Sequence, residues 1–389
     1  MIYLYVLLLR IVAILEGPQK IIAFIVIFFM ISYSTLKRIP TKKLIKISKY
    51  NFFALFMCFL ILIHGLIFGN VLLRDIAVLL TYWIWLVFTY TYFKNRSIEQ
   101  CLKYILIAFL IFNISNFLFF KFYFFDQALG INSIMSLFGI YGYRIYFPLS
   151  SGANIYTSQL ALNSLILLYF IKRSKIKYTF ISMYIFYLYM LILADSRLIL
   201  LFSLGFSIIY WFSLHTLLTL FKKFWWVIAI FFFGFLYVFY GTNLFDSFKR
   251  AGELDGIALS RIEIWSLAKD IIFSDYHFIT GYGLNGFENK LANTIQKAFE
   301  EQHLQTSHNF IIQNIIDFGF FGMLIILYLI FELLKMLVKL KSQIITILFV
   351  VILFMGITES IPSFYSFEPT LFFISILSII LTQYERKIN

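Results

Sequence analysis

The sequence predicts an all-α polytopic membrane protein with about twelve transmembrane helices and one large loop outside the membrane, between the ninth and tenth helices. Three observations support this prediction. Hydrophobic residues make up 62% of the 389 residues and charged residues 13%, and the mean hydropathy is +0.90, so a soluble globule could not bury its apolar surface. Apolar runs long enough to cross a bilayer as helix recur along the chain. These runs lack the period-two alternation of membrane β-strands.

The predicted spans form two groups, and the large loop separates them. Nine spans take up residues 1–240, the loop takes up residues 241–307, and three spans take up residues 308–389. The first run is the weakest, because it is short and contains Arg10. The apolar runs lie near residues 1–16, 19–36, 51–69, 71–93, 102–125, 154–171, 178–195, 197–220, 224–241, 309–334, 343–361 and 369–384.

Lysines and arginines concentrate in every second connection between the spans. Because short cytoplasmic loops accumulate basic residues, these connections and both termini are predicted to be cytoplasmic. The large loop then faces outward, as do the connections at 126–153 and 359–368. Most of the net charge of +13 is therefore a topology signal, and nucleic acid is not an expected partner. The basic residues are Lys37, Arg38, Lys42, Lys43, Lys46 and Lys49; Lys94, Arg96 and Lys103; Lys172, Arg173, Lys175 and Lys177; Lys222 and Lys223; Lys335, Lys339 and Lys341; and Arg386 and Lys387.

The large loop is predicted to contain an interfacial amphipathic helix over residues 261–273. A capping box fits its start, and Arg261 falls in the first turn, where a cation opposes the helix dipole. Helix propensity does not explain this arginine, but an anion such as phosphate, bound by the guanidinium and the free backbone N–H groups, would explain it. The alternative is a surface arginine paired with Glu263 or with an anionic lipid. The apolar face of the helix consists of Ile262, Trp265, Ala268 and Ile272.

A histidine marks the start of the tenth span. Thr306 or Ser307 can cap this helix, which would place His308 in its first turn at the outer membrane surface. A helix N-terminus disfavours the imidazolium ion, so the neutral ring could accept a proton, as a catalytic base must. The alternative is an interfacial histidine that makes ordinary hydrogen bonds.

No metal or cofactor is expected. His303 and His308 are five residues apart, which is not the spacing of a ligand pair on a helix. Gly281–Gly286 matches a dinucleotide-binding fingerprint in form only, because no strand and helix of a βαβ unit flank it. This segment is interpreted as a tight turn that allows two backbones to approach closely. Gly319 and Gly322 in the tenth span predict a helix-packing or kink site.

Two further arginines are predicted to face outward. Arg197 lies where the seventh span turns into the eighth, and a charged group at that depth is a functional candidate, although Asp195 could simply be its partner. Arg144 lies between aromatic residues whose faces could stack on sugar rings while the arginine meets an acidic group. Interfacial anchoring is the alternative role for the tyrosines of this cluster. The candidate glycan-binding aromatic residues are Tyr141, Tyr143 and Trp265.

The order of these motifs resembles the O-antigen ligase/polymerase superfamily. An arginine after a mid-chain span is followed by a large outer loop with Arg261-x-x-x-Trp265, then by Gly281-Tyr282-Gly283, His308-Asn309 and Gly319-x-x-Gly322. The resemblance implies a GT-C-like glycosyltransferase of the bacterial inner membrane that uses undecaprenyl-diphosphate-linked glycans without a metal. It implies that Arg197 and Arg261 bind the diphosphate and that His308 activates the acceptor hydroxyl. The arginine-rich motifs of the family's first large outer loop are represented here by little more than Arg144.

Within this superfamily we expect a polymerase of the Wzy type, which transfers a growing glycan to a new lipid-linked repeat unit of O-antigen or capsule. Its expected partners are the lipid-linked oligosaccharide, the lipid bilayer and a chain-length regulator of the Wzz type. The alternative in the same superfamily is a ligase that joins O-antigen to lipid A core. From another class, a flippase or other transporter would show polar residues in several spans and short loops on both sides.

Overall fold

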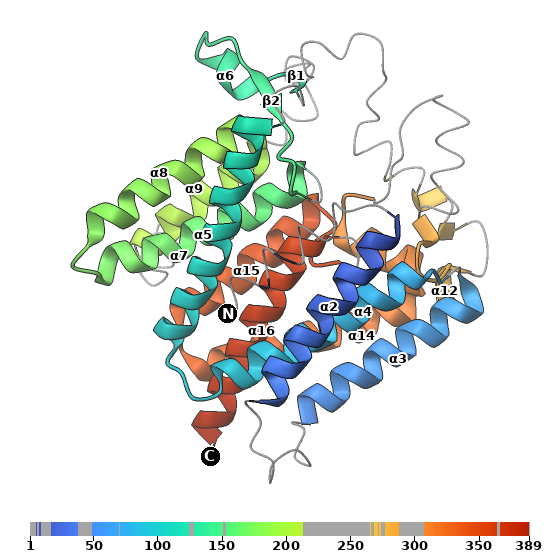
Figure 1. The fold of residues 1–389 in the computed structure, drawn as a ribbon. Helices are drawn as coiled ribbons and strands as arrows, with labels where there is room; N and C mark the ends of the chain where they lie inside the picture. Colours follow the sequence, from blue (N-terminus) through green and yellow to red (C-terminus); the bar gives the residue numbers. More distant parts are fainter. Residues whose placement is uncertain are drawn as a thin grey trace, which may run out of the picture.

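In the computed structural model the protein is mostly helical (Figure 1). The structure describes residues 5, 8, 17–37, 49–69, 71–123, 128–150, 153–212, 265, 268–270, 272–273, 277–287, 307–363 and 366–388.

Long helices in the described residues coincide with the predicted spans. The predicted spans near 1–16 and 224–241 lie almost wholly outside the described residues, so the count of twelve spans stays a prediction. Four of the helical segments are long and apolar enough to cross a membrane: Asp75–Phe93, Ile98–Lys121, Phe310–Leu340 and Phe367–Ile388. With the shorter apolar helices, they make this a multi-pass membrane protein. The long helices are α2 (Gly17–Leu36), α3 (Lys49–Phe68), α4 (Leu73–Phe93), α5 (Ile98–Tyr123), α7 (Ala153–Arg173), α8 (Lys177–Leu193), α9 (Arg197–Phe212), α14 (Phe310–Leu340), α15 (Gln343–Thr358) and α16 (Phe367–Ile388).

The core of the bundle lies around α7 and α16. Helix α7 packs against α8, α9, α15 and α16, and α16 also packs against α4 (Figure 1). Buried polar groups join α4 to α16, because the Trp85 indole N–H donates to the Leu371 carbonyl and the Thr89 hydroxyl bonds that of Ser378 at 2.6 Å. Such hydrogen bonds supply association energy that the hydrophobic effect cannot give within lipid.

The predicted outward connection at 126–153 contains a small β-hairpin, so the all-α expectation holds for the spans but not for this loop. Strands β1 (Ala128–Ile131) and β2 (Tyr143–Ile145) pair antiparallel, with the short helix α6 (Ser133–Leu137) between them. The hairpin lies at the upper end of the molecule in Figure 1, beyond the helices. Unpaired strand edges are costly in hydrocarbon but not in water, which is consistent with a position outside the membrane.

Helix α14 is interrupted in its first third by a glycine. Gly319 has φ 68° and ψ −177°, and the carbonyls of Ile316 and Asp317 before it accept hydrogen bonds from the Tyr282 and Gly283 N–H groups at 2.7 and 2.9 Å. A Cβ atom at Gly319 would collide with the backbone of α12 (His277–Thr280), with which the interrupted segment is in contact. The structure thus confirms both the kink at this site and the close backbone approach predicted for the glycine-rich turn.

Candidate functional site

Asn309, rather than Thr306 or Ser307, caps the helix that follows His308. The Asn309 Oδ1 atom accepts hydrogen bonds from the Ile311 and Ile312 N–H groups at 2.9 and 3.1 Å. Its Nδ2 atom donates to the Ile357 carbonyl at 2.9 Å, so the same side chain joins α14 to α15. Asparagine is as good an N-cap as serine, and this second bond favours it here. The prediction that His308 lies in the first turn is therefore wrong: His308 precedes the cap, with φ 52°.

His308 forms a pair with Glu359, at the end of α15. The His308 Nδ1 atom lies 3.0 Å from the Glu359 Oε2 atom. The glutamate side chain is only 2% exposed and the imidazole is 28% exposed, so the ring lies between a buried carboxylate and the surface. When Nδ1 donates to this carboxylate, Nε2 is the nitrogen that can accept a proton. The arrangement matches a base held by an acidic partner.

Sequence reasoning missed Glu359, although it lies in a connection predicted to face outward. The only available signal was an acidic residue directly after an apolar span. Its partner is 51 residues earlier in the chain. The contact forms because α14 and α15 are antiparallel neighbours, joined by a short turn at the other end of the bundle.

The segment just before His308 is held by α14 and by the large loop. The Gln313 side chain accepts a hydrogen bond from the Ser307 N–H at 2.8 Å and donates to the Asp317 carboxylate at 2.9 Å. From the loop, the Trp265 indole N–H donates to the Ser307 carbonyl at 3.0 Å. Trp265 is therefore anchored one residue from the candidate base.

The predicted amphipathic helix is helical wherever the structure describes it, at residues 265, 268–270 and 272–273. Its apolar face is buried as expected: Ala268 and Ile272 belong to a small core with Tyr282, Phe287 and Ile316. Arg261 lies outside the described residues, so its proposed contact with a diphosphate stays a prediction.

A second group of polar side chains surrounds the turn between α8 and α9. Arg197 is the first residue of α9, and its Nε atom lies 3.8 Å from the Oδ1 atom of buried Asp195. The same carboxylate oxygen accepts a hydrogen bond from the Ile134 N–H at 3.0 Å. Asp195 has φ 50°. The Arg197 side chain is 27% exposed, so its guanidinium is held near an acid and is partly accessible to solvent.

Arg144 points toward this same turn. It is buried, and its Nε atom donates to the Ala194 carbonyl at 3.1 Å. The Asn132 Nδ2 atom also donates to a carbonyl at the end of α8, that of Ile192, at 2.7 Å. These two hydrogen bonds hold the hairpin against the α8–α9 turn, close to Arg197. The two tyrosines of the cluster behave differently from the arginine, because Tyr141 is 96% exposed and Tyr143 is 67% exposed.

The two groups lie at the same end of the bundle. Arg197 begins α9 and Glu359 follows α15, and these two helices pack against each other. Within the described part of the chain, no group of three or more His, Cys, Asp or Glu side chains could hold a metal ion. What the site offers is a histidine with a buried carboxylate partner, one partly exposed arginine, and surface aromatic residues.

The comparison with known proteins finds a matching family. A family model described as O-antigen ligase matches residues 182–327, which begin in α8 and end in α14. The matched stretch includes Arg197, Trp265 and His308, whereas Arg144 and Glu359 lie outside it. None of the curated proteins matches the chain.

Proposed function

From the O-antigen ligase-like domain at residues 182–327, we propose that this protein is a membrane glycosyltransferase that polymerises lipid-linked repeat units. The domain match supports membership of the O-antigen ligase/polymerase superfamily. The single observation that supports a transferase site best is the pairing of His308 with buried Glu359. A transferase that activates a sugar hydroxyl needs a base held in one orientation, and a buried carboxylate provides that orientation.

The proposed reaction joins an acceptor sugar to a donor glycan attached to undecaprenyl diphosphate. The acceptor hydroxyl gives its proton to His308 Nε2 and attacks the anomeric carbon of the donor. The bond between that carbon and the diphosphate oxygen breaks, and undecaprenyl diphosphate leaves with the bonding electrons. The Glu359 carboxylate stabilises the imidazolium ion that forms, and the proton is later released to solvent.

Arg197 and Arg261 are proposed to bind the diphosphate. A leaving diphosphate gains negative charge in the transition state, and guanidinium groups placed where that charge develops accelerate the step. Asp195 and the α8–α9 turn hold Arg197 in position. Tyr141, Tyr143 and Trp265 are the proposed glycan-binding residues, because two of them are exposed and the third adjoins the segment that carries the base.

The reaction is proposed to occur at the outer face of the bacterial inner membrane, with both termini in the cytoplasm. Among the described residues, the basic connections at 94–103, 172–177 and 335–341 lie at the end of the bundle opposite to His308, which supports this orientation by the positive-inside rule. The product would be O-antigen or capsule, and a chain-length regulator of the Wzz type is the proposed protein partner.

The test uses purified protein in proteoliposomes with undecaprenyl-diphosphate-linked repeat units from the producing strain. We expect a ladder of products that differ by one repeat unit, and none with the His308→Gln variant. A second set of reactions adds lipid A core. If glycan were transferred to the core and no ladder formed, the protein would be a ligase, the activity that the matching family's description names. Unchanged substrate in both reactions, with folded protein, would contradict the transferase proposal.

A further inference from the structure

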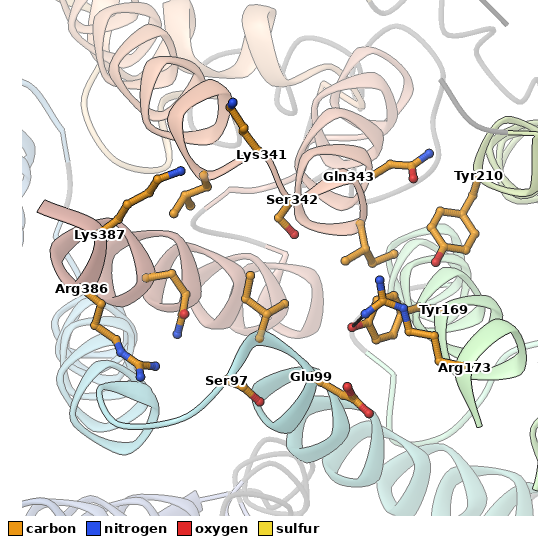
Figure 2. Close-up of a pocket in the computed structure, with 14 residues that line it drawn as sticks. Ser97, Glu99, Tyr169, Arg173, Tyr210, Lys341, Ser342, Gln343, Arg386 and Lys387 are labelled. Atoms are coloured by element: carbon orange, nitrogen blue, oxygen red, sulfur yellow. Dashed lines mark hydrogen bonds between the residues drawn. The ribbon is translucent and has the colours of Figure 1, made fainter. Parts of the chain in front are cut away.

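A cavity of about 870 Å³ lies at the end of the bundle opposite to His308. Six helix ends form it: the starts of α5 and α15 and the ends of α7, α9, α14 and α16. Figure 2 shows the residues that line it. Its size is that of a ligand pocket, and it mixes polar side chains with apolar ones such as Ile98, Leu340 and Ile344. Nothing in the proposed transferase reaction uses it.

The pocket is strongly basic. Four of the residues that line it are cations and one, Glu99, is an acid; the cations are Arg173, Lys341, Arg386 and Lys387. Figure 2 shows them in two groups, with Arg173 on one side of the pocket and the other three on the opposite side. This distribution favours a ligand that carries more than one negative charge.

The hydrogen bonds of these cations go to neutral groups. Arg173 donates to the Tyr169 hydroxyl at 2.7 Å, and Arg386 donates to the Arg96 carbonyl at 2.9 Å. Lys387 donates to the Lys339 carbonyl at 2.6 Å. Within the described ranges of the chain, none of the four cations forms an ion pair. Their charge therefore remains available to a bound anion.

A helix N-terminus adds to the positive potential. Helix α15 begins at Gln343, in the pocket, and its N-cap residue Ser342 makes no side-chain capping bond. The first N–H groups of a helix lack partners within the helix, and they favour an anion. On the other side of the pocket, the Tyr169 and Tyr210 side chains also line it (Figure 2). Their phenolic groups are typical of the membrane–water interface.

We propose that this pocket binds the phosphate-bearing headgroup of an anionic membrane phospholipid, with a preference for a headgroup that has two phosphates. Helix ends meet the bilayer at headgroup depth, and basic pockets between transmembrane helices bind such headgroups. The neighbouring surface is apolar, because Trp211, Phe212 and Val338 are exposed near the ends of α9 and α14. The acyl chains of a bound lipid would lie along that surface.

The test measures lipid binding to the full-length, delipidated protein by native mass spectrometry. The probes are diphosphatidylglycerol, phosphatidylglycerol and phosphatidylcholine, with inorganic pyrophosphate added as a soluble competitor. We expect diphosphatidylglycerol to bind more tightly than phosphatidylglycerol and both to bind more tightly than phosphatidylcholine. We expect the Arg386→Gln/Lys387→Gln double variant to lose about tenfold in affinity for diphosphatidylglycerol, since each cation near the surface contributes severalfold.

A matched control removes a lysine that lies at the same end but outside the pocket. Lys335 pairs with Glu332 at 2.7 Å, and Lys335→Gln should leave lipid affinity unchanged. An equal loss in this control would show a nonspecific effect of surface charge and overturn the proposal. Equal binding of all three lipids would also overturn it, and pyrophosphate that displaces the lipid at similar concentrations would identify a soluble ligand instead.

A second variant guards against a folding defect. Gln343→Glu places a negative charge in the pocket at the first turn of α15, where an acid stabilises the helix. This variant should fold at least as well as the parent protein, which the melting temperature checks, and should bind diphosphatidylglycerol several times more weakly. Unchanged affinity in this folded variant would contradict the proposed site.

Discussion

The two ends of the helical bundle hold their charges in different ways. At the end that contains His308, acidic side chains are buried and bonded to partners within the protein. At the other end, cations line an open pocket and bond only neutral groups among the described residues. The buried acids of the first end are Asp75, Asp195, Asp317, Glu359 and Glu368.

This difference supports the proposals that the His308 end performs the transfer reaction and that the opposite end binds an anionic lipid headgroup. A buried carboxylate is costly unless it is bonded, so its retention is most easily explained where it orients another group. Exposed cations cost little and attract anions over a distance set by ionic strength. The predictions below test the first end, each with a control at the second end or elsewhere in the bundle where the chain offers one.

The largest expected effect comes from removing the imidazole. His308→Ala should lower the polymerisation rate by about 10²–10⁴-fold, because a positioned general base contributes that much. His308→Gln can still bond Glu359 but cannot accept a proton, so it should be equally inactive. Rates are measured as repeat units transferred by reconstituted protein. Activity of His308→Gln above one tenth of the parent rate would refute the assignment of His308 as the base.

The next effect concerns stability at the interruption in α14. Gly319→Ala should destabilise the protein by about 3 kcal/mol, because a Cβ atom there meets the Ile279 backbone and the residue has positive φ. The control is Gly205→Ala in α9, where a Cβ atom meets nothing within 4 Å. That variant should melt at or above the parent temperature, since alanine favours a helix. The readout is thermal unfolding in detergent, and similar melting of the two variants would contradict the close packing at Gly319.

The sequence predicted those features of the fold that depend on one continuous segment of the chain. Apolar length predicts the spans, and 3.6-residue periodicity predicts the buried face that contains Ala268 and Ile272. Gly281 and Gly319 were identified by residue type, because only glycine tolerates such close backbone contact. The helix cap was misassigned, since Ser307 and Asn309 are both good caps and the contact of Asn309 with α15 decided between them.

Contacts between distant segments were not predictable. Glu359 reaches His308 through the packing of α14 against α15, and no local pattern reports that pairing. The basic pocket draws its lining from six helix ends, whereas the sequence showed only the basic loops as a topology signal. The hairpin of β1 and β2 was missed as well, because its strands have only four and three residues and give no clear alternation.

A smaller effect is expected for the partner of the candidate base. Glu359→Gln should lower kcat by about tenfold or more with little change in KM, because it removes the charge that stabilises the imidazolium ion but preserves side-chain volume. Since Glu359 is proposed to act through His308, its loss should also change the pH profile of kcat, which a purely structural role would not do. Glu359→Asp should recover part of the rate.

The control for Glu359 is an acid at the opposite end. Glu332→Gln removes a surface carboxylate that pairs only with exposed Lys335 in the described structure, and it should leave kcat unchanged. If Glu359→Gln lowered kcat/KM through a higher KM and left kcat unchanged, Glu359 would be assigned to acceptor binding rather than to orienting the base.

The smallest expected effect is on glycan binding at the surface of the hairpin. Tyr141→Ala and Tyr143→Ala should each raise the KM for lipid-linked glycan by about two- to tenfold with kcat unchanged, because stacking on a sugar ring contributes about 0.5–1.5 kcal/mol. Tyr178, at the start of α8, is 74% exposed and lies at the other end of the bundle, so Tyr178→Ala is the matched control. A tyrosine that only anchors the protein in the interface would behave alike at both ends. If all three variants had the same KM, Tyr141 and Tyr143 would be assigned to interfacial anchoring. A KM that rises only in the Tyr141→Ala and Tyr143→Ala variants would assign these tyrosines to glycan binding.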